Sequence, residues 1–99
     1  MHVISRKKLI EFYEKTEFQD SKEPLEAWYY EAKHAKWTTP ANVKDQYRSA
    51  SILKDSRVGF NIAGNKYRLI VKVNYCSRTV FIRFIGTHRE YDKIDAEVI

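Results

Sequence analysis

The feature of this sequence that most restricts its fold is a change in the spacing of apolar residues near residue 51. Between residues 6 and 37 the apolar residues recur every three or four positions, which is typical of amphipathic helices. Between residues 57 and 85 they alternate with polar residues, which is typical of strands with one buried face. Helices followed by hairpin-joined strands predict an α+β fold, with the helices packed on one face of a mostly antiparallel sheet and the opposite face left for a ligand.

Local signals set the expected limits of these elements. We expect a short N-terminal strand, two or three helices and three long strands, over residues 2–5, 6–16, 20–37, 39–47, 57–62, 67–75 and 79–85. The spacing of Asp20 and Glu23 predicts a capping box at the start of the second helix. In the last strand we expect Val80, Ile82 and Phe84 to share one face, and we expect Gly86 to end the strand.

Size and composition limit the class of protein. The 99 residues are enough for one hydrophobic core, so we expect a single domain over residues 1–99. A single cysteine, Cys76, excludes an internal disulfide. No apolar run is long enough to cross a bilayer, and the N-terminus lacks the apolar core of a signal peptide. We therefore expect a cytoplasmic protein that does not act at a membrane.

The charge is concentrated in one part of the chain. The net charge is +5, and residues 50–89 contain eight basic residues but only one acidic residue, Asp55. The last ten residues are acidic. A basic region of this length attracts polyanions, among which phosphate backbones are common. The alternative is a solvated basic surface without a ligand.

Four residues of this basic half are candidates for catalysis, namely Arg83, His88, Tyr91 and Arg68. A guanidinium group can hold two phosphate oxygens, and an imidazole can give or take a proton near neutral pH. Tyr91 can stack on a base or donate a hydrogen bond. Alternatively, His88 and Tyr91 pack the C-terminal turn, and each arginine covers apolar surface and pairs with a carboxylate.

Three further cations, Lys54, Arg57 and Lys66, flank the first expected hairpin. Each can contact a phosphate, although an exposed solubilising charge is the commoner role of such residues. The three histidines lack metal-ligand spacing, and the chain has no glycine-rich phosphate loop. We therefore expect neither a metal nor a cofactor.

Two segments carry a resemblance to a known family. Residues 60–70 read Phe-Asn-Ile-Ala-Gly-Asn-Lys-Tyr-Arg-Leu-Ile, and residues 81–92 end in Thr-His-Arg-Glu-Tyr-Asp. With these segments the chain resembles the HigB toxins of bacterial type II toxin–antitoxin modules, within the RelE-like superfamily. The resemblance implies a RelE-like fold and an mRNA interferase that cleaves messages without a metal, commonly on the translating ribosome.

The resemblance also implies roles for the candidate residues. A ribonuclease of this kind drives the ribose 2′-OH against the adjacent phosphorus, leaving a 2′,3′-cyclic phosphate and a 5′-hydroxyl. Arg68 and Arg83 would hold the scissile phosphate, His88 would be the acid or the base, and Tyr91 would orient the nucleotide or share in proton transfer. Lys54 would add positive charge near the 2′-OH.

The implied partners are mRNA, the ribosomal A site and a HigA-type helix-turn-helix antitoxin, through which the complex would bind operator DNA. Two other functions are compatible with the same basic surface. One is an RNA-binding module without enzymatic activity. The other is an interaction protein whose cationic face docks an acidic partner such as an antitoxin segment.

Overall fold

The computed structural model describes residues 1–99 and confirms the α+β class. The elements are β1 (His2–Ile4), α1 (Arg6–Tyr13), the 3-10 helix η1 (Thr16–Ser21), α2 (Lys22–His34), α3 (Pro40–Gln46), β2 (Ser51–Ile52), β3 (Arg57–Ile62), β4 (Tyr67–Asn74), β5 (Thr79–Thr87) and α4 (His88–Tyr91). None of the helices has both the length and the apolar character needed to cross a membrane.

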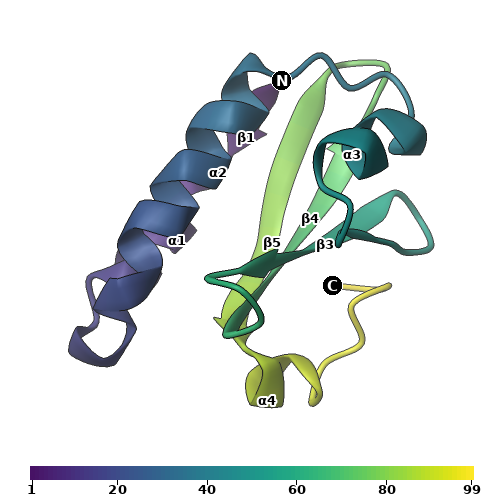
Figure 1. Ribbon diagram of the computed structural model, residues 1–99. Coiled ribbons are helices and arrows are strands. Elements are labelled where there is room, and N and C mark those ends of the chain that lie inside the picture. The colour runs from purple at the N-terminus through teal and green to yellow at the C-terminus, as the bar shows by residue number, and fades with distance from the viewer.

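The strands form one five-stranded sheet in the order β1-β5-β4-β3-β2. β1 pairs with β5 in parallel, and all other pairs are antiparallel, which confirms the expected mostly antiparallel sheet. Figure 1 shows α1 and α2 together along one side of β5, and α4 at the end of that strand. The edge strand β2 was not expected, because a strand of two residues has no detectable alternation.

The helices and the sheet enclose one hydrophobic core that is rich in aromatic residues. Phe60 on β3 lies at its centre, with its ring centroid 5.4 Å from Trp28 of α2 and 5.1 Å from Tyr47. Trp37 stacks on the same ring at 6.2 Å. α2 ends at His34 rather than near residue 37 because the chain becomes extended there, which carries Trp37 into this core.

A β-bulge in β5 changes which of its residues face the core. Ile70 of β4 pairs with Phe84, whereas the next residue of β4 pairs with Ile82, so that Arg83 is an extra residue in β5. The expectation that Phe84 shares a face with Ile82 is therefore wrong, and Ile85 packs against the helix-side core instead. A strand that contains a bulge cannot keep one strict alternation along its length.

The prediction that Gly86 ends the last strand is also wrong. β5 continues through Gly86, which pairs with Arg68, and ends at Thr87. A Cβ atom at Gly86 would lie 2.7 Å from Cζ of Phe84, so a larger residue here would require the Phe84 ring to move. α4 follows at once because Thr87 and Glu90 form a capping box through each other's backbone N–H groups.

The face of the sheet opposite the helices is partly covered by residues 88–99, so the expectation that it is left open is wrong for this part. Ile70 is fully buried although it does not belong to the helix-side core, and Ala96 is also buried. Tyr91 lies over Arg68 of β4. After α4 the chain turns back toward β3 (Figure 1).

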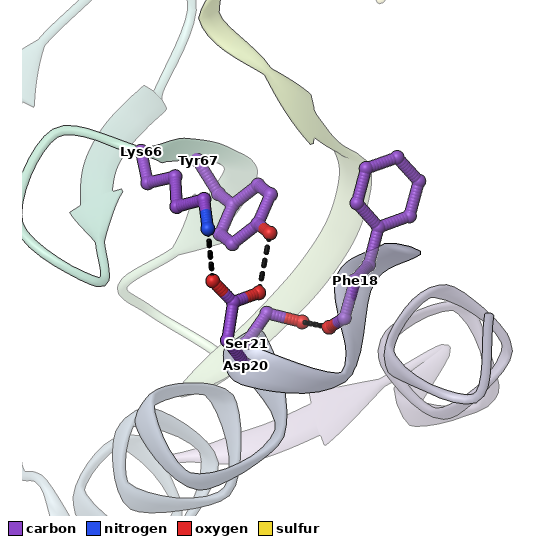
Figure 2. A network of polar contacts seen from close by, with 5 residues as sticks. All are labelled: Phe18, Asp20, Ser21, Lys66 and Tyr67. Carbon is purple, nitrogen blue, oxygen red and sulfur yellow. Dashed lines mark hydrogen bonds and ion pairs between the residues drawn. The ribbon is translucent and has the colours of Figure 1, made fainter. Parts of the chain in front are cut away.

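The predicted capping role of Asp20 is wrong, because its carboxylate binds the β3–β4 hairpin instead. Asp20 accepts hydrogen bonds from Nζ of Lys66 and from the hydroxyl of Tyr67 (Figure 2). The N-cap of α2 is Ser21, whose Oγ donates to the carbonyl of Phe18 at 2.6 Å. The contact joins the helical half of the chain to the sheet, and the bonds from Lys66 and Tyr67 lower the pKa of Asp20.

Replacing Asp20 with asparagine is expected to lower the melting temperature at pH 7. Because the folded state lowers the pKa of Asp20, its stabilising effect is present above the ordinary carboxyl pKa and is lost as the pH falls through the folded value. The difference in melting temperature between wild type and variant should therefore narrow below about pH 4. Thermal melts across pH 2–7 measure this difference. Glu17→Gln, which removes an exposed carboxylate from the same 3-10 helix, is the control, and a difference that does not change with pH would contradict the assignment.

Candidate functional site

The candidate site is built around Arg68, which lies on the face of β4 that points away from the helices. The residues on either side of it, Tyr67 and Leu69, face the core. The arginine itself is only 6% exposed. Nη1 donates to Oδ1 of Asn61 at 2.9 Å, and Nη2 donates to Oγ of Ser51 at 2.7 Å. The guanidinium group therefore extends across β3 toward the edge strand β2.

The charge of Arg68 has no counter-ion in the protein. The one ion pair of the structure joins Lys66 to Asp20, and no carboxylate oxygen lies within 4.0 Å of the Arg68 guanidinium. Its Nε atom is buried and has no hydrogen-bond partner. A buried cation that is not paired is costly, so this arrangement favours the binding of an anion.

α4 places an aromatic ring beside this cation and an imidazole beside that ring. The Tyr91 ring centroid is 5.1 Å from Cζ of Arg68, and the rings of Tyr91 and His88 are 6.3 Å apart. Residues three apart in a helix are neighbours on its surface, and the capping box of α4 fixes its first turn. Arg68, His88 and Tyr91 therefore form one cluster, which we call the Arg68 cluster.

Two polar atoms of the Arg68 cluster are buried without partners. The whole structure has four such side-chain atoms, and two of them are Nε of Arg68 and Nε2 of His88. An unsatisfied buried polar group costs about 1–3 kcal/mol, so its presence in a folded protein requires an explanation. A catalytic role is one recognised explanation.

Lys54 and Arg57 lie beside the acidic C-terminal segment. The backbone N–H of Lys54 donates to the Glu97 carboxylate at 3.1 Å. Nε and Nη2 of Arg57 both donate to the backbone oxygen of Ile99, at 3.1 and 2.6 Å. The acidic segment therefore contacts the guanidinium group of Arg57 but only the backbone of Lys54.

Arg83 is exposed, and the neighbours of its side chain differ from those of Arg68. Its Cζ lies 5.7 Å from the centroid of Phe81. It also lines a shallow hollow against α1, together with Lys8, Glu11, Phe12, Lys15, Phe84 and Ile85. The residues that line this hollow include none of those that hold Arg68. Lys66 is exposed and paired with Asp20.

Sequence reasoning missed three residues that hold Arg68, namely Ser51, Gly59 and Asn61. Asn61 could have been found, because a hairpin that turns at residues 63–66 pairs Asn61 with Arg68. Ser51 gave no such signal, since β2 is too short to be recognised. The role of Gly59 is visible only in the structure, where the side chain of Arg68 lies against it.

Comparisons with known proteins identify the family. The sequence model of the HigB toxin, described as the RelE-like toxic component of a toxin-antitoxin system, matches residues 21–94. The mRNA interferase toxin HigB of Escherichia coli K12 is 31% identical over 94 residues, which are 93% of this chain and 88% of that protein. The mRNA interferase HigB of Shigella flexneri matches with the same values. The mRNA interferase HigB of Escherichia coli O6:H1 is 25% identical over 96 residues, or 95% of this chain and 91% of that protein.

These matches confirm the resemblance seen in the sequence. The matched region contains the Arg68 cluster and the three residues that hold Arg68. The chain therefore belongs to the HigB family of RelE-like toxins, the toxic components of toxin–antitoxin systems.

Proposed function

We propose that this chain is the toxin of a type II toxin–antitoxin pair and acts as an endoribonuclease that cleaves mRNA. Its relatives bear the name mRNA interferase. The observation that carries the proposal is the buried Arg68 guanidinium, which is held by neutral oxygen atoms and lies beside Tyr91, whose ring neighbours that of His88. Such a cation can stabilise the negative charge that develops on a phosphate during cleavage.

The proposed reaction needs only groups of the protein and the RNA. The 2′-oxygen forms a bond to phosphorus, and the bond from phosphorus to the 5′-oxygen breaks. A base takes the proton of the 2′-OH and an acid gives a proton to the 5′-oxygen, which leaves a 2′,3′-cyclic phosphate and a 5′-hydroxyl. Arg68 would bind the phosphate, His88 would serve as acid or base, and Tyr91 would orient the nucleotide or share in proton transfer.

Binding of RNA should move α4. Nε2 of His88 is buried in the free protein, so a substrate cannot reach that atom without a local shift. Because α4 has only four residues, we expect a small displacement of this helix to expose the imidazole. Catalytic hydrogen bonds often form fully only in the substrate complex.

The remaining cations would bind the RNA on either side of the cleaved bond. Arg57 binds the C-terminal residue, so RNA would compete with the C-terminal segment for its guanidinium group, whereas the exposed side chain of Lys54 is contacted only through its backbone. Lys66 would have to exchange Asp20 for a phosphate, which an exposed ion pair permits. Arg83 would contact a phosphate at the hollow beside α1.

The partners that follow from this function are a HigA-type helix-turn-helix antitoxin and the ribosomal A site, where the message would be cut in the cytoplasm. The toxin–antitoxin complex would bind operator DNA through the antitoxin. The family description supports an antitoxin partner.

Mapping of message ends tests the function. After induced expression of the chain, new 5′-hydroxyl ends should accumulate inside coding regions, and an uninduced culture should lack them. Purified protein that binds RNA without producing ends would favour the RNA-binding module. A protein that neither binds nor cleaves RNA but captures an antitoxin would favour the interaction protein that docks an acidic partner.

Replacing Arg83 with alanine is expected to weaken RNA binding more than it slows the bond-breaking step. Arg83 is exposed and lies outside the Arg68 cluster, so one phosphate contact should be lost. In a plot of the logarithm of RNA affinity against the logarithm of salt concentration, the slope should become less steep by about one. Filter binding at several salt concentrations and single-turnover cleavage measure the two effects. Lys7→Ala, which removes a cation elsewhere on α1, is the control, and a lower cleavage rate at saturating RNA would contradict this role.

A further inference from the structure

The side chain of Arg68 is held at two corners by neighbouring strands. Asn61 pairs directly with Arg68 in the β3–β4 register and accepts from Nη1 at 2.9 Å. Ser51 on β2 pairs with Gly59 and accepts from Nη2 at 2.7 Å. Because the two acceptors bind different nitrogen atoms, they fix both the position and the plane of the guanidinium group.

Gly59 provides the surface on which this group rests. A Cβ atom at this position would lie 2.7 Å from Nη2, 2.9 Å from Cζ and 3.2 Å from Nε of Arg68. The backbone of Gly59 does not adopt a positive φ angle, so the glycine is explained by space and not by conformation. Any side chain here would displace the guanidinium group from its two acceptors.

All three residues that surround the guanidinium group are uncharged. An aspartate at position 61 would keep an oxygen acceptor near Nη1 but would form a buried ion pair with the arginine. An arginine paired in this way has less attraction for a phosphate. Neutral acceptors instead orient the group and leave its charge available.

We propose that Ser51, Gly59 and Asn61 are positioning residues that orient Arg68 while keeping it free of a counter-charge. This inference rests on the proposed function, because it assumes that Arg68 binds the phosphate that is cleaved. The three residues themselves need not touch the RNA. Their contribution is a cation whose direction is set before the substrate arrives, so that no reorganisation is required during the reaction.

Asn61→Asp separates this role from a merely structural one. The substitution keeps the size of the side chain and its oxygen acceptor but adds a negative charge beside Nη1. Cleavage of a model RNA should fall on the order of 10- to 100-fold, less than the about 100- to 1,000-fold expected when a charge-stabilising group is removed, because the guanidinium group stays but its charge is paired. The melting temperature should stay equal or rise, because the new carboxylate pairs with Arg68. Loss of activity without loss of stability is not expected from a structural residue.

Asn65→Asp is the matched control, since it makes the same change in an exposed turn residue and should cleave within about twofold of wild type. If Asn61→Asp cleaves as well as Asn65→Asp, the inference is wrong. A second test does not depend on that variant's folding: Ser51→Ala should lower cleavage, and Ser51→Thr, which keeps the hydroxyl group, should restore it. Equal activity of both Ser51 variants would also overturn the inference.

The outcome of the wild-type protein distinguishes the two proposals. If the wild-type protein cuts no message on or off the ribosome, the proposed function fails. If it cuts RNA and the Asn61 and Ser51 variants cut equally well, only the positioning role fails.

Discussion

Replacing Arg68 with methionine is expected to lower RNA cleavage by about 100- to 1,000-fold, the range seen when a group that stabilises transition-state charge is removed. Methionine keeps most of the apolar stem and removes the guanidinium group. The fold should be retained, because the removed charge is buried without a counter-ion, and its loss offsets the hydrogen bonds lost to Asn61 and Ser51. Single-turnover cleavage and a thermal melt of the same preparation measure the two properties.

Arg68→Lys tests whether geometry matters as well as charge. A lysine has one charged nitrogen and cannot bind Asn61 and Ser51 while presenting a planar pair of donors to a phosphate. We expect its cleavage rate to stay at least about tenfold below wild type. A lysine variant with wild-type activity would show that charge alone is sufficient, and a methionine variant with wild-type activity would exclude Arg68 from the reaction.

Replacing His88 with glutamine is expected to lower cleavage by about 100- to 10,000-fold, the usual range for the loss of a proton-transfer group. The substitution should leave the fold intact, because Nε2 of His88 makes no hydrogen bond in the free protein. Glutamine can still form hydrogen bonds but cannot transfer a proton in this pH range. Cleavage rates from pH 5 to pH 9, compared with RNA affinity, test the role.

The pH dependence makes this result specific. If His88 transfers a proton, the variant should lose a pH-dependent limb of the rate profile while its RNA affinity stays close to that of wild type. His34→Gln is the control, since His34 is exposed on α2, and it should cleave normally. A His88→Gln variant that cuts at the wild-type rate would show that His88 only packs α4.

The sequence predicted the fold well where its signals are local. Thr39 and Pro40 predicted the start of α3, where Thr39 and Asn42 form a capping box. Alternation predicted β3 and β4 to within a residue of their ends. The prediction failed at Asp20. Its carboxylate binds Lys66 and Tyr67, which follow it in the chain by 46 and 47 positions. A capping box and a distant contact use the same side chain, and only packing decides between them.

The candidate site was predicted in part. His88, Tyr91 and Arg68 were named from residue type and from the family resemblance, and the structure places them side by side. That Arg83 shares a phosphate with Arg68 stays a prediction, and the structure places Arg83 beside residues of α1 and β5. The bulge makes Arg83 the extra residue of β5, so alternation along the strand could not predict which way its side chain lies.

By itself the sequence determined the order of helices and strands, the strongly basic second half and membership of the toxin family, because periodicity, charge and family motifs are properties of neighbouring residues. Only the tertiary structure decided which arginine is buried without a counter-ion and which residues hold it. The bond from Arg68 to Ser51 joins residues 17 apart, and the contact with Tyr91 depends on where α4 turns. These contacts arise from strand register and from packing across the sheet, neither of which is encoded in any short segment of the chain.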